Sequence, residues 1–311
     1  MTATDTSISL FLADDTATAQ LGEDLALALK AGDCVALSGD LGAGKSSLAR
    51  ALLRAMADDA ELDVPSPTFT LVQSYELRIP VSHFDLYRLG DPSELMELGF
   101  DEALQTGICL VEWPEMAESE LPKERIVIKL EHEGEGRRAT IMAPARQMAR
   151  IRRVLAIRAF LDASGYAGAR RRFLTGDASL RAYESIYPRG EGSRVILMDW
   201  PPLPEGPAVL DGKPYPKVAH LAENAYPFVA LADILRENGF ATPEIFSVDY
   251  EQGILLIEDL GTDGVLDEHG RPIAERYRAS VACLAHLHSL TIPHDIPVTP
   301  DHTHHIPDFD R

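Results

Sequence analysis

Residues 39–46 read Gly-Asp-Leu-Gly-Ala-Gly-Lys-Ser and fit the pattern G-x-x-x-x-G-K-[ST] of a phosphate-binding loop, or P-loop. A polyphosphate needs several backbone N–H groups turned inward, and glycine allows so tight a curl because it has no Cβ. Lys45 is then placed to reach the terminal phosphates, and the Ser46 hydroxyl to ligate Mg²⁺. We therefore expect a nucleoside triphosphate to contact Gly39, Asp40, Leu41, Gly42, Ala43, Gly44, Lys45, Ser46 and Ser47.

Two carboxylates stand where predicted strands end. Asp85 closes the run of residues 81–85, and Glu112 closes the run of residues 108–112. P-loop proteins place acids in this way beside Mg²⁺ and the attacking water. We expect Asp85 and Glu112 to be catalytic together with Lys45 and to be metal ligands together with Ser46, although an acid at a strand end is often only a capping residue. His83 is expected to be a packing residue without a catalytic role.

The segment between the P-loop and these acids offers two hydroxyl groups. Two prolines exclude a helix and predict that residues 64–72 form an exposed loop before a strand. Ser66 and Thr68 fit a switch loop that senses the γ-phosphate or the attacking water. They fit a rigid turn with locally bonded hydroxyls equally well.

The surrounding pattern predicts the elements that position these residues. A short apolar run before the P-loop predicts a buried strand, and leucines at helical spacing after it predict a helix. Asp14 or Asp15 can cap an earlier helix. Together the patterns predict an α/β domain, a P-loop NTPase fold with a central, largely parallel sheet that closes near residue 143. Its expected strands are 7–12, 34–38, 81–85, 108–112 and 125–130, and its expected helices are 15–30 and 92–104.

Bulk properties exclude several classes of protein. The 29 Lys and Arg against 49 Asp and Glu give a net charge of −20, which disfavours broad binding to a nucleic-acid backbone. The three cysteines, Cys34, Cys109 and Cys283, form no C-x-x-C pair and are expected to be small buried residues. The sequence shows no apolar run of membrane-spanning length and no leader pattern at its start, so we expect a cytoplasmic protein.

Four blocks of sequence together resemble the TsaE family, the ATPase subunit of bacterial tRNA threonylcarbamoyladenosine synthesis. They are the P-loop, Ser-Pro-Thr-Phe-Thr-Leu-Val at 66–72, His-Phe-Asp-Leu-Tyr-Arg at 83–88 and Val-Glu-Trp-Pro-Glu at 111–115. The resemblance covers about residues 7–143. It implies an ATPase that works with the transferase subunits TsaD and TsaB and meets tRNA through that complex.

The resemblance also implies roles for single residues. Lys45 and Ser46 would hold phosphates and Mg²⁺, Glu112 would ligate Mg²⁺, and Asp85 would be the second acid. Glu115 and Arg137 fall where the family contacts nucleotide. Ser46 departs from the threonine that the family usually has, but either hydroxyl can ligate Mg²⁺.

The second half of the chain begins with an arginine-rich segment. Residues 146–172 contain eight arginines and the single acid Asp162. We interpret residues 146–169 as a linker helix whose charges face solvent or acidic neighbours, with a local tRNA or subunit contact as the alternative. This divides the chain into an ATPase domain (1–145), a linker helix (146–169) and a second domain (170–311).

The second domain resembles the N-terminal lobe of aminoglycoside-phosphotransferase-like kinases, most closely those acting on N-acetylmuramate or N-acetylglucosamine. The matching blocks lie at 176–181, 198–202 and 256–261, within an expected α+β order of strands and helices. The strand at 194–199 lacks the phosphate-pairing lysine, and nothing after residue 170 fits the pattern H-x-D-x-x-x-x-N. We expect a truncated, inactive kinase-like domain that would phosphorylate amino sugars only when complete. His302, His304 and His305 are expected in a flexible tail.

Three other functions compete with a TsaE-type ATPase. A P-loop small-molecule kinase would need an acceptor pocket and a mobile arginine-bearing lid, and the sequence shows no clear lid. A GTP-dependent switch would need an N-K-x-D base-reading motif, which is absent. A nucleotide that only holds an assembly together is the nonenzymatic alternative.

Overall fold

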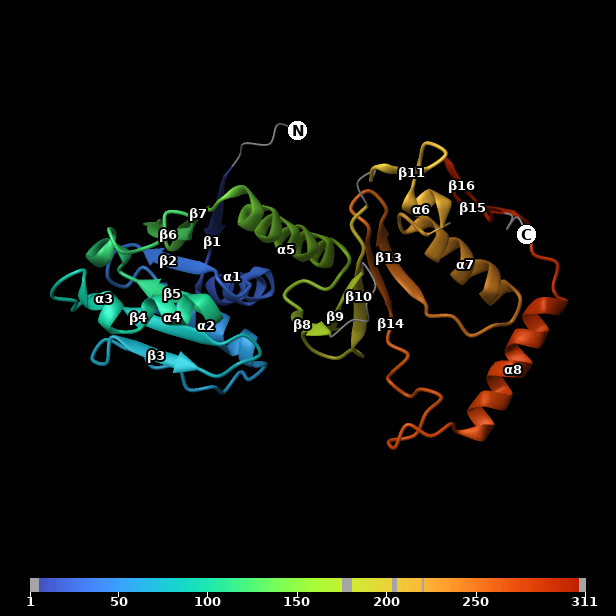
Figure 1. Ribbon diagram of the computed structural model, residues 1–311, viewed down its shortest axis with the longest axis horizontal. Helices are drawn as coiled ribbons and strands as arrows, with labels where there is room; N and C mark the ends of the chain where they lie inside the picture. The colour runs from blue at the N-terminus through green and yellow to red at the C-terminus, as the bar shows by residue number, and fades with distance from the viewer. Residues whose placement is uncertain (1–5, 175–180, 203–205, 220, 308–311) are drawn as a thin grey trace. The chain divides into compact units, whose positions relative to one another are not determined.

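The computed structural model describes residues 6–174, 181–202, 206–219 and 221–307, and it divides into two compact units (Figure 1). The first unit comprises residues 1–172 and the second comprises residues 173–311. Among the described residues, no helix combines the length and the apolar character needed to cross a bilayer.

The first unit is built on a seven-stranded sheet in the order β1-β7-β6-β2-β5-β4-β3. The four inner neighbours β6, β2, β5 and β4 run parallel, whereas β1, β7 and β3 pair antiparallel at the edges. The strands are β1 (Ser7–Leu12), β2 (Cys34–Ser38), β3 (Val72–Tyr75), β4 (Val81–Asp85), β5 (Ile108–Glu112), β6 (Ile126–Glu133) and β7 (Gly136–Met142). The predicted α/β domain with a parallel central sheet is therefore confirmed.

Helices cover both faces of this sheet. In β5, Ile108 and Leu110 face one core and Cys109 and Val111 face the other, because successive strand residues point to opposite sides. The first core includes α1 (Asp15–Ala28), α2 (Lys45–Ala57) and α5 (Ala145–Ala163). The second core includes α3 (Glu94–Glu97), α4 (Phe100–Thr106) and the 3-10 helix η1 (Pro114–Ala117). Asp85 and Glu112 have the strand parity of the face that α2 covers.

Most helices and strands of this unit begin and end close to the residues predicted from the sequence, but two features differ. Asp14 caps α1, accepting from the Ala17 N–H at 2.7 Å as expected. The single helix expected at 92–104 is wrong, because Gly99 takes a left-handed conformation with φ of 77° and separates α3 from α4. Strand β7 was not predicted, and it pairs with both β6 and β1.

The arginine-rich helix α5 is an integral part of the first unit. Its apolar face, which includes Ile151 and Leu161, is buried at 0% exposure. Arg150 pairs with Asp33 at 2.8 Å, and Arg158 pairs with Asp24 at 2.9 Å. The segment expected as a linker thus packs against α1, and the boundary found by compactness falls after Arg172.

Asp24 on α1 is the centre of a buried ion network. Its carboxylate accepts from Arg158 Nη2 and from Arg171 Nη1, each at 2.9 Å, and it is 2% exposed. Both guanidiniums also donate to backbone carbonyls, at Ala169 and Val154. A buried charge is tolerated only when it is paired and hydrogen-bonded, and here one carboxylate serves two arginines.

Four strands of the second unit and β8, which begins in the last residues of the first unit, form a five-stranded sheet in the order β13-β14-β10-β9-β8. Its strands are β8 (Arg170–Leu174), β9 (Ala182–Tyr187), β10 (Val195–Asp199), β13 (Ile245–Asp249) and β14 (Ile254–Glu258). Helix α7 (Tyr226–Glu237) packs on it through Val229, which shares a core with Met198 and Leu255. Of the matching block at 176–181, residues 176–180 lie outside the described residues.

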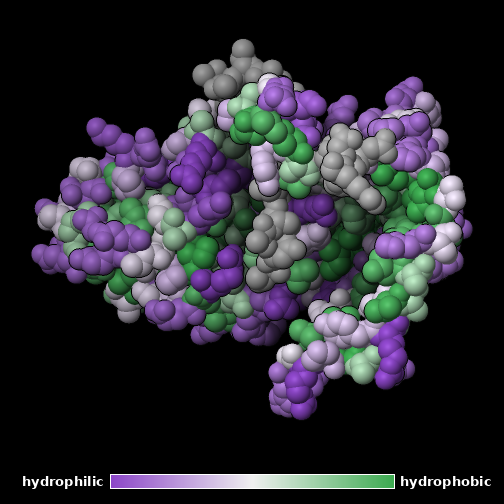
Figure 2. Space-filling view, turned by 45° about the vertical axis from the view of Figure 1, so that its right-hand side comes forward, coloured by the Kyte–Doolittle hydropathy of each residue, from purple (hydrophilic) through white to green (hydrophobic). Residues whose placement is uncertain are grey.

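The remaining elements of the second unit include a helix and a hairpin. Helix α8 (Ala274–Ser289) has no buried residue, and Tyr277, Val281 and Leu284 are exposed on it. In the space-filling view of Figure 2, hydrophobic residues (green) are visible at the surface among hydrophilic ones (purple). The flexible tail expected around His302–His305 is wrong, because these residues form β16 and pair with β15 (Asp295–Thr299). The unit also contains β11 (Ala208–Leu210), β12 (Lys213–Pro214) and α6 (Tyr215–Val218).

The cysteines differ in their environment. Cys34 and Cys109 are buried as expected, and burial raises the pKa of each thiol to about 12. Cys283 is exposed on α8, contrary to the expectation that all three are buried.

Replacing Asp24 by asparagine should destabilise the first unit by about 3–5 kcal/mol, because Arg158 and Arg171 would remain buried without their anion. Chemical denaturation followed by circular dichroism measures this loss. Asp162→Asn, an exposed position on α5, is the matched control and should change stability little. An equal, small effect of both substitutions would show that the network does not stabilise the unit.

Candidate functional site

The P-loop joins β2 to α2 and takes the backbone shape that its glycines permit. Gly39, Gly42 and Gly44 have φ values of 137°, 79° and 106°. A Cβ on Gly39 would lie 2.2 Å from the Leu130 carbonyl oxygen, and one on Gly44 would lie 2.1 Å from Arg137 Nη1. Backbone conformation favours glycine at both positions, and at Gly39 space also requires it because the obstacle is a backbone oxygen.

Lys45 is the first residue of α2, and its side chain turns back over the loop. Its Nζ donates to the carbonyl oxygens of Gly39 at 2.6 Å and Asp40 at 3.0 Å. The residue is only 5% exposed, and desolvation lowers the pKa of the ammonium group. Nearby carboxylates oppose this shift, the largest such effect being that of Glu112.

Glu112 lies at the C-terminal end of β5 and is held from two sides. Its Oε2 accepts from Ser46 Oγ at 2.8 Å, and its Oε1 lies 2.9 Å from His83 Nε2. Glu112 and His83 are each 1% exposed. His83, expected only to pack, therefore orients this carboxylate from the neighbouring strand β4.

Asp85 ends β4 directly beside Glu112 in the sheet register. Its Oδ2 accepts from Ser66 Oγ at 2.8 Å and from Thr68 Oγ1 at 2.9 Å, while its Oδ1 accepts from the Tyr87 N–H at 3.2 Å. The carboxylate thus ties the loop of residues 64–72 to the edge of the sheet.

These groups line one cavity of about 310 Å³. Ten of the residues predicted from the sequence line it: Leu41, Gly42, Gly44, Lys45, Ser46, Ser47, Ser66, Thr68, Asp85 and Glu112. Gly39, Asp40 and Ala43 complete the loop beneath them. Arg137 lies against Gly44 and pairs with Asp15 at 2.7 Å. Glu115 does not line the cavity, but its charge acts on Lys45 from η1.

Two lining residues, Tyr87 and Trp113, were missed in the sequence. Lys45 Nζ lies 3.6 Å from the centroid of the Trp113 ring, and the Tyr87 ring is 4.9 Å from the same ring. Trp113 has a φ of 59°, a conformation that costs a non-glycine residue about 1–3 kcal/mol and is typical of functional sites. The sequence did carry a signal for them, because Tyr87 lies two residues after Asp85 and Trp113 lies one residue after Glu112.

The donor set suits a magnesium nucleotide. A hydroxyl and a carboxylate oxygen, 2.8 Å apart at the start of α2, are hard ligands of the kind Mg²⁺ takes alongside phosphates and water. Among the described residues, no group of three or more His, Cys, Asp or Glu side chains is arranged to hold a metal ion by itself. Strand, glycine-rich loop, lysine and helix in this order define a P-loop nucleotide-binding domain.

Comparison with known proteins makes the class more specific. The family model for "Threonylcarbamoyl adenosine biosynthesis protein TsaE" matches residues 12–140. A tRNA threonylcarbamoyladenosine biosynthesis protein TsaE from Rickettsia felis is 39% identical over 130 residues, which are 42% of this chain and 75% of the relative. The Bacillus subtilis protein of the same name is 40% identical over 111 residues, 35% of this chain and 68% of that protein. The chain belongs to the TsaE family through its N-terminal part.

A solved structure is also similar. The crystal structure of Bacillus subtilis YdiB is 26% identical in sequence and aligns with a TM-score of 0.42, covering 49% of this chain and 95% of that one. The family membership expected from the four sequence blocks is confirmed by the family model and by the relatives.

Glu112→Gln should raise the Mg²⁺ concentration needed for nucleotide binding about 10-fold or more, because the substitution keeps the shape but removes the anionic ligand. Calorimetric titration of nucleotide at several Mg²⁺ concentrations measures the change. Glu97→Gln removes the same charge from an exposed position and should behave as wild type. An unchanged Mg²⁺ dependence in Glu112→Gln would contradict a ligand role.

Proposed function

We propose that the first unit is a Mg²⁺-dependent ATPase that serves the threonylcarbamoyladenosine modification of tRNA. The observation that carries the proposal is the bond between Ser46 at the end of the P-loop and Glu112 at the end of β5, 2.8 Å long. It joins the phosphate-binding loop to a buried acid at the point where a P-loop ATPase holds its metal. The relatives' names supply the process.

The loop residues would hold the nucleotide, and Ser46 and Glu112 would hold Mg²⁺. Bound Mg²⁺ neutralises phosphate charge and so favours phosphoryl transfer. Lys45 supplies a positive charge that its bonds to two loop carbonyls orient toward the phosphates. Arg137, packed on Gly44, and Glu115 would contact the nucleotide from the margin of the site.

Asp85 would act beside Glu112, which is its register partner in the sheet. Its bonds to Ser66 and Thr68 support the switch-loop interpretation, since a carboxylate engaged by both hydroxyls couples the loop position to the site. We propose that Asp85 orients the attacking water or its metal shell, and that the loop reports the γ-phosphate. Phe69 on this loop is 84% exposed, which makes the loop accessible to a partner.

The proposed partners are the transferase subunits TsaD and TsaB, with tRNA reached through that complex in the cytoplasm. The net charge of −20 supports indirect contact, because an acidic surface repels a phosphate backbone. Turnover measured with and without the transferase subunits separates this function from a nucleotide that only holds an assembly together. Analysis for a phosphorylated metabolite separates it from a small-molecule kinase.

Lys45→Ala should reduce ATP turnover by about 100-fold or more, because it removes the positive charge oriented toward the phosphoryl group. A coupled phosphate-release assay with the transferase subunits present measures this. Lys123→Ala, an exposed lysine of the same unit, should retain full turnover. Undiminished hydrolysis in Lys45→Ala would refute the ATPase assignment.

For the second unit we propose a kinase-like N-terminal lobe without activity of its own. The five-stranded sheet, with its antiparallel pairs and the packed helix α7, supports this interpretation. The stretch 195–199 carries no lysine for phosphate pairing, and residues 170–311 contain no H-x-D-x-x-x-x-N pattern. A complete kinase-like domain of this type would act on amino sugars.

The full chain carrying Lys45→Ala should consume no ATP when N-acetylglucosamine or N-acetylmuramate is added, because neither unit would then have a working phosphoryl-transfer site. The assay follows ADP formation with and without sugar. Sugar-dependent ADP formation by this variant would show that the second unit is an active kinase.

A further inference from the structure

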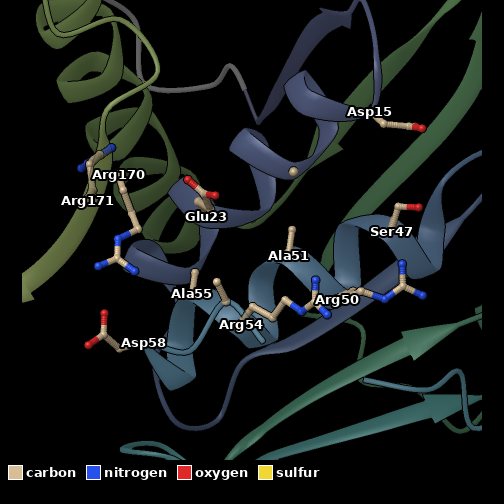
Figure 3. Close-up of a pocket in the computed structure, with 12 residues that line it drawn as sticks. Asp15, Glu23, Ser47, Arg50, Ala51, Arg54, Ala55, Asp58, Arg170 and Arg171 are labelled. Carbon is tan, nitrogen blue, oxygen red and sulfur yellow. The ribbon is translucent and has the colours of Figure 1, made fainter. Parts of the chain in front are cut away.

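The first unit contains a second cavity, of about 390 Å³, beside helices α1 and α2 (Figure 3). Residues of both helices line it, as do Arg170 and Arg171 at the C-terminal end of the unit. Its volume lies within the range of about 300–1,000 Å³ that small-molecule sites occupy. It shares only Ser47 with the lining of the nucleotide cavity.

Three of the charged groups that line the cavity form ion pairs with residues outside its lining. The pairs are Arg171 with Asp24 at 2.9 Å, Asp58 with Arg172 at 2.8 Å, and Asp15 with Arg137 at 2.7 Å. In all, four arginines and three acids line the cavity, a formal charge of +1. The lining is therefore net positive in a protein whose net charge is −20, and Arg50 and Arg54 supply part of that positive charge.

Arg50 and Arg54 lie one turn apart on α2 (Figure 3). Arg54 Nε donates to the Leu62 carbonyl oxygen at 3.0 Å, and Arg50 Nε donates to the Val64 carbonyl oxygen at 3.4 Å. These acceptors are neutral, so they orient the guanidinium groups without offsetting their charge. Two oriented guanidiniums match the geometry of phosphate oxygens, which they bind in a bidentate manner.

The cavity also has an apolar wall. Ala19 on α1, Ala51 and Ala55 on α2, and Ala60 after α2 present methyl groups to it. A ligand there would place an uncharged body against the alanines and its anionic group on the arginines. The acids that also line the cavity disfavour a polyanion such as RNA.

We propose that this cavity binds a small organic phosphomonoester, with the phosphate on Arg50 and Arg54 and the body against the alanine wall. A phosphomonoester carries a charge of about −1.5 to −2 at neutral pH, which the two guanidinium groups of Arg50 and Arg54 can balance. Arg170 and Arg171 lie beyond residues 12–140, the range that the family model matches. The cavity in its present form therefore depends on residues outside the matched range.

Calorimetric titration of the full chain with phenyl phosphate tests the proposal. The titration is made in the Lys45→Ala background to weaken phosphate binding at the P-loop. Phenyl phosphate should bind, and the added double substitution Arg50→Gln with Arg54→Gln should weaken this binding at least about tenfold, since each arginine supplies charge-assisted hydrogen bonds. Adding Arg146→Gln instead, an exposed arginine on α5, should leave binding unchanged.

Two further probes define the ligand class. Benzoate, a monoanion with the same ring, should bind at least about tenfold more weakly than phenyl phosphate. Inorganic phosphate should also bind more weakly, because it lacks the apolar body. Benzoate binding as tight as phenyl phosphate would overturn the phosphomonoester assignment, and inorganic phosphate binding as tight would overturn the role of the alanine wall.

Absence of phenyl phosphate binding, or equal binding by the double variant, would overturn the proposed site itself. Circular dichroism checks that each variant is folded. If the double variant does not fold, Arg54→Lys serves in its place, because it keeps the charge but loses the planar fork. It should bind phenyl phosphate more weakly than the parent, and unaltered binding would count against the site.

Discussion

The first unit depends on one buried carboxylate. Glu112 is 1% exposed at the end of a central strand, where an ionised acid without partners would cost several kcal/mol. Ser46 and His83 satisfy its two oxygens, one from the start of α2 and one from β4. These bonds set the position of the P-loop helix relative to the sheet. The geometry that would hold Mg²⁺ is thus the same geometry that makes the buried acid tolerable.

The parallel order of the inner strands explains why the site lies where it does. In a parallel sheet the carboxyl ends of β2, β5 and β4 meet at one edge, so residues far apart in sequence become neighbours. Ser46 and Glu112 are separated by 66 positions, yet they share a hydrogen bond. Asp85 then brings the loop of residues 64–72 to the same edge through two hydroxyls.

The arginines of α5 have a structural role in the first unit. Arg158 and Arg171 enclose Asp24, and Arg150 pairs with Asp33, so cations from the end of the unit meet acids from α1 and from the turn before β2. This pairing keeps α5 on the sheet although its composition resembles an exposed linker. Asp24 and Asp33 do not pair with Arg50 and Arg54, the two α2 arginines that line the cavity beside that helix.

Local chemistry made much of this molecule predictable. The glycine pattern predicted the loop between β2 and α2, and Asp85 and Glu112 end β4 and β5 as predicted. A cap was expected at Asp14 or Asp15, and Asp14 caps α1. The apolar spacing predicted one continuous helix over residues 92–104, but the left-handed conformation of Gly99 divides it into α3 and α4. The spacing does not show which glycine adopts that conformation. His83, Tyr87 and Trp113 could not be assigned in advance, since their contacts join separate strands and loops.

The same division applies to charge. Sequence composition determined the total of −20 and the concentration of arginines in residues 146–172. Only the tertiary structure decided which arginines are neutralised, because an ion pair requires a distance of a few ångströms that chain order does not specify. Asp24 and Arg171 are 147 positions apart and in contact, whereas Arg50 and Arg54 keep their charge at the wall of a cavity.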